Sequence, residues 1–149
     1  MGPAMYPIQV SKVAATLGGE RALGAQLNTV SELAAAVAHG LPRTVVGALA
    51  AQAANDPDSR RRIAALVVSP ATYKRSQQLS PAASERAERL ARVTALAQQA
   101  LGGAEEARTW LGEKHPLLAD HPPIEVAATD LGARQVERIL LNIEYGLPA

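Results

Sequence analysis

The sequence predicts an all-α protein, and three observations support that fold class. Of the 149 residues 31 are alanine, the residue with the highest helix propensity. Apolar residues recur at steps of three or four, and no alternating run of β-branched residues is long enough for a strand. Ser-Pro and Gly-Gly pairs mark helix starts and stops. Because alanine removes little area from water, the composition favours close-packed helices whose burial a partner surface completes.

The first 79 residues predict five helices joined by tight turns. They span residues 8–17, 29–39, 43–54, 57–66 and 71–78. The expected helix boundaries are an end at Gly18-Gly19, an N-cap at Thr29 or Ser31, and new starts at Asp56-Pro57 and Ser69-Pro70. This part is therefore expected to form an N-terminal helical domain, residues 1–79.

The longest predicted helix begins at Ser80-Pro81 and ends at Gly102-Gly103, a length of roughly 30 Å at 1.5 Å per residue. Its apolar side consists of Ala83, Ala87, Leu90, Thr94, Ala97 and Leu101. The Glu85/Arg89 and Glu88/Arg92 pairs, each four residues apart, are expected on its exposed face. This helix is predicted to join the N-terminal domain to a small C-terminal domain, so that the second domain spans residues 80–149.

The last third predicts a short helix over residues 104–111, an irregular stretch over 112–123 and a helical turn over 123–128. A final helix follows, capped by Thr129 or Asp130. Its apolar residues are Leu131, Val136, Ile139, Leu140 and Ile143.

Composition also limits the function. A net charge of +1, with 19% charged and 48% apolar residues, is typical of a folded chain rather than a disordered tail. The absence of cysteine from the sequence excludes a disulfide framework and thiolate metal sites. Neither an apolar run of 18 residues nor a signal-peptide pattern is visible, so we expect a cytoplasmic protein with no membrane partner.

Residues 56–78 have the layout of a helix-turn-helix, in which the second helix enters the DNA major groove and the first crosses the phosphates. Residues 56–92 carry a net charge of +4 and residues 104–149 a net charge of −4, which suggests one binding task toward nucleic acid and another toward a different partner. The candidate DNA contacts are Arg60, Arg61, Ser69, Thr72, Tyr73, Lys74, Arg75 and Gln77. A solvated basic hairpin without a DNA role is the alternative.

No active site is predicted. His115 and His121 flank Asp120, but metal-binding histidines usually lie at i,i+4 spacing or beside cysteines, so two exposed loop histidines are the preferred interpretation. Phosphate-cradling glycine motifs and nucleophile motifs are missing from the sequence. We therefore expect no enzyme activity, no catalytic residue, no metal and no cofactor.

A succession of motifs in the last third is distinctive. It consists of Ala104-Glu105-Glu106-Ala107-Arg108-Thr109-Trp110-Leu111, His115-Pro116-Leu117-Leu118, Pro123-Ile124-Glu125-Val126, Gly132-Ala133-Arg134-Gln135-Val136-Glu137 and Ile143-Glu144-Tyr145-Gly146. This succession resembles the toxin-binding domain of the Xre/MbcA/ParS-type antitoxins. Upstream, Ser69–Arg75 and Leu79-Ser80-Pro81 resemble the family's Xre-like recognition segment, so that the resemblance covers about residues 60–149.

The resemblance implies a type II antitoxin that neutralises a RES-domain toxin, an enzyme that consumes NAD or uses it for ADP-ribosylation. In this family the C-terminal region packs on the toxin and places its tail at the NAD cleft. The tail corresponds here to Glu144, Tyr145, Gly146, Leu147, Pro148 and Ala149. Arg134 and Arg138, one turn apart on the final helix, are further candidate toxin contacts, and the alternative is that they face only Glu137 and water. The resemblance also implies a homodimer that forms a hetero-oligomer with the toxin and binds operator DNA to repress its own operon.

The composition of the tail suits this role. Tyr145 is a large amphipathic anchor, Gly146 permits close approach of the backbone, and Pro148 limits the entropy lost on docking. A frayed C-terminus is the alternative for the tail. For the whole chain, the alternative is a stand-alone helix-turn-helix regulator whose C-terminal domain only oligomerises.

Overall fold

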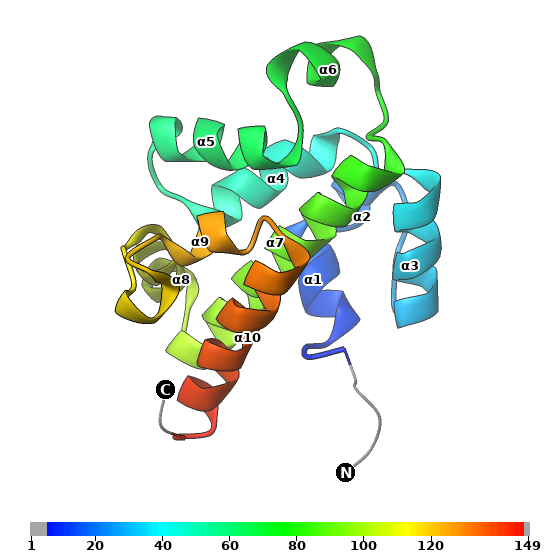
Figure 1. The fold of residues 1–149 in the computed structure, drawn as a ribbon. Helices are drawn as coiled ribbons and strands as arrows, with labels where there is room; N and C mark the ends of the chain where they lie inside the picture. The colour runs from blue at the N-terminus through cyan, green and yellow to red at the C-terminus, as the bar shows by residue number, and fades with distance from the viewer. Residues whose placement is uncertain (1–5, 148–149) are drawn as a thin grey trace.

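A computed structural model describes residues 6–147, and within this range it contains helices and no strand (Figure 1). The α-helices are α1 (Val10–Thr16), α2 (Gly19–Leu23), α3 (Val30–His39), α4 (Thr44–Ala53), α5 (Pro57–Val67), α6 (Pro70–Arg75), α7 (Pro81–Leu101), α8 (Ala104–Gly112), α9 (Pro123–Val126) and α10 (Asp130–Glu144). A 3-10 helix, η1 (Pro116–Leu118), lies between α8 and α9. The all-α class predicted from the sequence is confirmed.

The long helix α7 is the central element of the fold. It packs against α10 along one side and against α1, α3, α4, α5 and α8 around the rest of its surface (Figure 1). Five residues of its predicted apolar side, Ala83, Ala87, Leu90, Thr94 and Ala97, are buried, and Leu101 is half-buried. Because α7 packs on helices from both parts of the chain, a single continuous core results. The predicted domain boundary between residues 79 and 80 stays a prediction.

Side-chain caps explain where the helices begin. Thr29 and Glu32 form a reciprocal capping box at α3, which decides between Thr29 and Ser31. Thr129 accepts the Gly132 N–H at α10, which decides between Thr129 and Asp130. Asp56, Ser69 and Ser80 each cap a helix that has proline in its first turn, as the sequence predicts.

Three local predictions are corrected. The helix predicted over 71–78 ends at Arg75, because residues 77–79 form backbone hydrogen bonds with residues 41–43 instead of continuing the helix. A second helix, α2, begins at Gly19, within the predicted stop at Gly18-Gly19. The stretch predicted as irregular contains η1. Both missed helices, of five and three residues, are too short to show a periodic signal.

The expectation that Glu88 and Arg92 lie on an exposed face of the long helix is wrong. Their ion pair is present at 3.2 Å, but both side chains are only about 15% exposed. Tyr6 and the Glu137 side chain of α10 cover them. Helical spacing alone predicts the pair but does not tell which helix packs over it.

Close approach of α9 and α10 explains the glycine in the Gly-Ala-Arg motif. A Cβ atom on Gly132 would lie 1.8 Å from the Val126 carbonyl oxygen, which is far below any allowed contact. Glycine therefore allows the first turn of α10 to lie against the end of α9. This contact positions the first turn of α10 relative to α9, and α10 then packs along α7.

Candidate DNA-reading and partner-binding surfaces

The outer surface of α6 presents a row of connected polar side chains. The Ser69 hydroxyl accepts the Thr72 N–H at 3.2 Å and donates to Thr72 Oγ1 at 2.9 Å. Arg75 Nη2 donates to the same Thr72 oxygen at 3.2 Å. These three side chains and Lys74 are exposed, and α6 has no buried residue. The row, Ser69–Thr72–Arg75, orients the Arg75 guanidinium in advance of any ligand.

The connection after α6 ties the helix to the rest of the molecule. Residues 77–79 cross residues 41–43 in antiparallel fashion, with the N–H groups of Leu79 and Arg43 donating at 2.8 and 2.9 Å. The Gln78 side-chain amide then donates to two carbonyls at the end of α3, at 3.1 and 2.8 Å. The predicted DNA contact Gln77 lies in this crossing, where its side chain is exposed.

Tyr73, another predicted DNA contact, is half-buried against a residue that the sequence analysis missed. Arg43 Nη1 donates to the Tyr73 carbonyl at 3.0 Å, and the Arg43 guanidinium carbon lies 5.2 Å from the centre of the Tyr73 ring. The two residues are 30 positions apart in the chain. No local pattern identifies Arg43, because periodicity and capping signals report only neighbours in sequence.

Several arginines of the basic segment are used inside the protein. Arg60 Nε donates to the Ala54 carbonyl at 2.9 Å, where it closes the end of α4. Arg86 and Arg89 of α7 donate to backbone carbonyls at 3.0 and 2.9 Å. The exposed basic side chains of residues 56–92 are Arg61, Arg62, Lys74 and Arg75. Arg61 forms an ion pair with Asp58 on α5. The surface charge around α6 is therefore smaller than the sequence count indicates.

The C-terminal helix and the three residues that follow it expose an unusual share of the large apolar side chains. Of the six large apolar residues that are exposed in the part of the chain described, four lie between residues 131 and 147. Leu131 is 76% exposed and Tyr145 is 70% exposed. Helical spacing places Leu131, Arg134, Arg138 and Tyr145 on one side of α10, opposite the buried Ala133, Val136 and Leu140. We call this set the outer face of α10.

The tail begins with a defined helix stop. Gly146 has φ = 67°, its N–H donates to the Ile143 carbonyl at 3.2 Å, and the Leu147 N–H donates to the Asn142 carbonyl at 2.7 Å. These two bonds form a Schellman motif, for which a left-handed glycine is the usual residue. Gly146 thus ends the helix, and residues 145–147 are held by the cap while Tyr145 and Leu147 stay exposed. The predicted contacts Pro148 and Ala149 lie outside the described residues.

Glu144 faces inward rather than toward the outer face. Its Oε1 accepts a hydrogen bond from Gln99 Nε2 of α7 at 2.6 Å, and Gln99 Oε1 accepts one from Lys12 Nζ of α1 at 2.9 Å. The second carboxylate oxygen of Glu144 is buried without a hydrogen-bond partner among the described residues. Glu144 therefore anchors the end of α10 to α7. Arg134 and Arg138 are both exposed, with Arg134 paired to Asp130 at 3.2 Å.

A charged cluster fastens the middle of α10 to α7. Arg92 lies between two carboxylates, at 3.2 Å from Glu88 and 2.9 Å from Glu137, and the Tyr6 hydroxyl donates to Glu88 at 2.5 Å. Burial raises the pKa of Glu137 above its ordinary value, while the positive charge of Arg92 opposes that rise. Burial, followed by the charge of Glu88, also raises the pKa of Tyr6. The cluster joins the N-terminal segment, α7 and α10.

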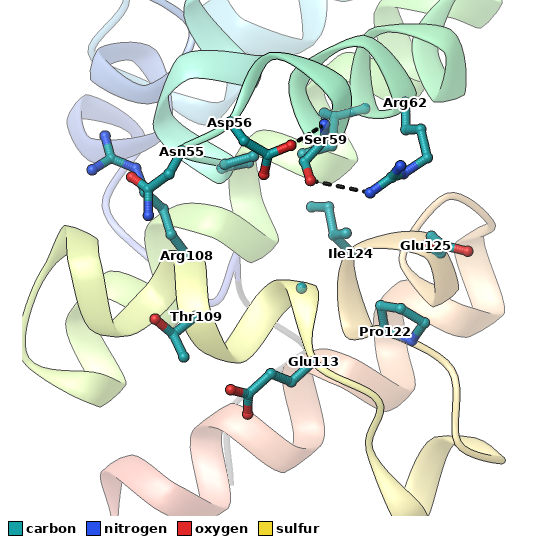
Figure 2. A pocket seen from close by; sticks show the side chains of 14 residues that line it. Asn55, Asp56, Ser59, Arg62, Arg108, Thr109, Glu113, Pro122, Ile124 and Glu125 are labelled. Carbon is teal, nitrogen blue, oxygen red and sulfur yellow. Dashed lines mark hydrogen bonds between the residues drawn. The ribbon is translucent and has the colours of Figure 1, made fainter.

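A cleft of about 280 Å³ lies between α5, α8 and α9 (Figure 2). Ser59 stands between Asp56 and Arg62, since its N–H donates to Asp56 at 2.9 Å and its hydroxyl accepts from Arg62 at 3.1 Å. The first of these bonds lowers the pKa of Asp56. Arg108 donates to the Ala51 carbonyl at 3.0 Å and links α8 to α4. These polar groups serve helix caps and helix contacts.

The two loop histidines face each other across a turn. The His115 N–H donates to the His121 carbonyl at 3.2 Å, and His115 Nδ1 accepts the Leu117 N–H at 3.1 Å. His121 is exposed, as predicted, whereas His115 is half-buried against the edge of Trp110. Residues 6–147 contain no group of three side chains suited to hold a metal ion. The absence of catalysis and of a cofactor stays a prediction.

These surfaces define a two-part helical protein, in which a helix-turn-helix precedes a small helical domain with an exposed outer face. Residues 32–92 match the family model described as the antitoxin Xre-like helix-turn-helix domain. Residues 96–146 match the model described as the antitoxin Xre/MbcA/ParS C-terminal toxin-binding domain. The chain thus carries an Xre-like helix-turn-helix domain followed by an Xre/MbcA/ParS toxin-binding domain, as the motifs of its last third indicate.

A curated relative supports this assignment. The antitoxin Xre of Pseudomonas putida is 32% identical over 90 residues, which cover 60% of this chain and 57% of the relative. The match thus spans little more than half the length of that protein. Within residues 6–147, every helix is too short or too polar to cross a bilayer.

Proposed function

We propose that this chain is a type II antitoxin that neutralises a RES-domain toxin by filling its NAD-binding cleft. The toxin either consumes NAD or uses it for ADP-ribosylation. The observation that carries the proposal is the outer face of α10, which exposes Leu131, Arg134, Arg138 and Tyr145 within the segment that matches the toxin-binding domain.

The chemistry of this surface is that of a protein interface. Burial of exposed apolar area contributes about 25 cal/mol per Å², and Tyr and Arg are enriched among the residues that dominate binding energy. Tyr145 and Leu147 supply the apolar area next to the tail. Arg134 and Arg138 are suited to bidentate pairing with carboxylates on a partner.

The anchoring of α10 supports the role of the tail as a plug. Gln99 holds Glu144 at 2.6 Å, and the Schellman motif fixes the direction in which the chain leaves the helix at Leu147. A tail whose direction is fixed loses less entropy on entering a cleft than a freely moving one. Glu144 and Gly146 thus act on the toxin through the position of the tail.

We further propose that α5 and α6 bind operator DNA and repress the antitoxin's own operon in the cytoplasm. The exposed Arg61, Lys74 and Arg75 provide phosphate contacts, and the Ser69–Thr72–Arg75 row provides base-edge donors. A homodimer places two α6 helices on half-sites about 34 Å apart. With the toxin bound, the complex is a hetero-oligomer. In Figure 1, α6 and the end of α10 lie at opposite ends of the molecule, which leaves room for both partners.

Two variants with opposite effects test the proposal. Deletion of residues 145–149 is expected to abolish inhibition of NAD turnover by the RES-domain enzyme encoded beside this chain, and to leave DNA binding intact. The double variant Lys74→Ala/Arg75→Ala is expected to lose DNA binding and keep inhibition, since both side chains lie away from α10. Purified antitoxin alone is expected to turn over no NAD.

The possible failures have different meanings. Inhibition by the shortened chain would exclude the tail mechanism. If the full-length chain binds DNA but neither binds nor inhibits the enzyme, the alternative of a stand-alone helix-turn-helix regulator holds. Unchanged DNA binding by the double variant would show that Lys74 and Arg75 lie away from the phosphates.

A further inference from the structure

We propose that Arg43 is the positioning residue of the DNA-reading helix: it sets the orientation of α6 without itself touching DNA. The inference rests on the proposed DNA binding and adds a residue that lies outside the helix pair α5 and α6, at the start of α4.

Helix α6 does not hold itself in place. It has six residues, none of them is fully buried, and only Tyr73 packs partly against the core, so it lacks the broad apolar face that normally fixes a helix on its core. Isolated helices of this length are unstable in water. Ser69 caps its first turn, but the last carbonyls of the helix need partners from elsewhere in the chain.

Arg43 donates hydrogen bonds to one carbonyl in the last turn of α6 and to one carbonyl in the connection that follows it. Its Nη1 donates to the Tyr73 carbonyl at 3.0 Å, its guanidinium lies over the Tyr73 ring at 5.2 Å, and its backbone N–H donates to the Gln77 carbonyl at 2.9 Å. One residue thereby contacts both the last turn of α6 and the connection that follows it. Its positive charge also complements the negative end of the helix dipole.

The position of Arg43 separates it from the reading surface. Successive helical residues are rotated by about 100°, so Tyr73 projects to a different side of α6 from Thr72 and Arg75, the two members of the row that lie within the helix. Arg43 is half-buried on the Tyr73 side. A planar guanidinium both donates and stacks, whereas lysine provides only a point charge, so Arg43→Lys is not expected to replace it.

DNA binding at several salt concentrations tests the role. The probes are a duplex of the sequence directly upstream of the chain's own reading frame and a scrambled duplex of equal length. Arg43→Ala is expected to weaken binding to the upstream duplex about tenfold and to leave the salt slope unchanged. Arg75→Ala is the matched comparison, and it is expected to reduce that slope by about one.

Amide hydrogen exchange gives a readout that does not depend on DNA. Arg43→Ala and Tyr73→Leu are expected to accelerate exchange in residues 70–79 by about fivefold or more, with thermal unfolding followed by Trp110 fluorescence nearly unchanged. Tyr73→Phe keeps the ring under the guanidinium and is expected to behave as the parent protein. Arg43→Lys is expected to resemble Arg43→Ala.

Each contrary result has one meaning. A reduced salt slope in Arg43→Ala would make Arg43 a phosphate contact and overturn the proposal. Unchanged exchange in residues 70–79, or full rescue by lysine, would also overturn it. Failure of the parent protein to prefer the upstream duplex would instead contradict the proposed operator binding, and the exchange data would still decide whether Arg43 holds α6.

Discussion

The two helices to which we assign binding roles are held in opposite ways. Helix α10 has 15 residues and buries five of them against α7 and its neighbours, whereas α6 has six residues and buries none. The position of α10 follows from its own apolar side. That of α6 is imposed by the Arg43 contacts with Tyr73 and by hydrogen bonds between residues 39–43 and residues 77–79 of the connection that follows it.

Because of this difference, we expect substitutions near α10 and near α6 to affect the stability of the protein differently. Substitutions on the inner side of α10 act on the whole core, since that helix completes the burial of α7. Substitutions in or around α6 are expected to act on local order, since Tyr73 is its one side chain that packs partly against the core and none is fully buried. DNA reading is therefore expected to be lost without unfolding, whereas the partner-binding helix unfolds with the rest of the chain.

The largest expected effect lies on the inner side of α10. Leu140 is fully buried, and Leu140→Ala is expected to lower the free energy of unfolding by about 2–5 kcal/mol through lost transfer free energy and a residual cavity. Urea denaturation followed by Trp110 fluorescence measures it. The matched control is Leu131→Ala on the outer face, where little change in stability is expected. Similar losses in both variants would contradict the assignment of the two sides.

The sequence was most informative where structure depends on neighbours in the chain. The caps Asp56, Ser69 and Ser80, each followed by proline, predicted three helix starts correctly. Helical spacing also predicted the buried side of α7. In both cases the interacting residues are three or four positions apart, so one sequence contains the whole signal.

The sequence was least informative where arginines are concerned. Arg86 and Arg92 counted toward a basic segment but contact the Val67 carbonyl and the carboxylates of Glu88 and Glu137. Arg43 lies outside that segment and contacts α6. A charge count cannot distinguish an exposed guanidinium from one that caps a distant carbonyl, because the partner is set by tertiary packing. The motifs of the last third identified the family, whereas the outer face of α10 needed the structure.

A pair of cap variants sharpens the comparison between the helices. Ser69→Ala and Thr129→Ala each remove one hydroxyl that accepts a backbone N–H, at 3.2 Å in α6 and 3.0 Å in α10. Loss of such a cap costs about 1 kcal/mol. Thr129→Ala is expected to show this loss in global unfolding. Ser69→Ala is expected to show it only as faster amide exchange in residues 70–75, because α6 opens without the core.

The contrary pattern is easily recognised. If Ser69→Ala lowers the midpoint of global unfolding as much as Thr129→Ala does, α6 is part of the cooperative core and the proposed difference between the two helices is wrong. Ser31→Ala serves as the control, since Ser31 is an exposed serine near a helix start that donates and accepts no capping bond there.

The smallest expected effect concerns the enclosed charges beneath α10, which have no counterpart around the exposed α6. Burial raises the pKa of Glu137 above the ordinary 4.5. Between pH 4.5 and this raised pKa, the folded chain therefore binds more protons than the unfolded chain. This contribution to stability is therefore fully present below that pH range and decreases as the pH rises through it.

Glu137→Gln removes the titration of this side chain. The variant is expected to lose less stability than the parent as the pH rises above 4.5, as measured by urea denaturation at each pH. The exposed Glu125→Gln should leave the pH dependence of the parent unchanged, and equal pH dependence in all three proteins would show that the Arg92 cluster keeps Glu137 charged throughout.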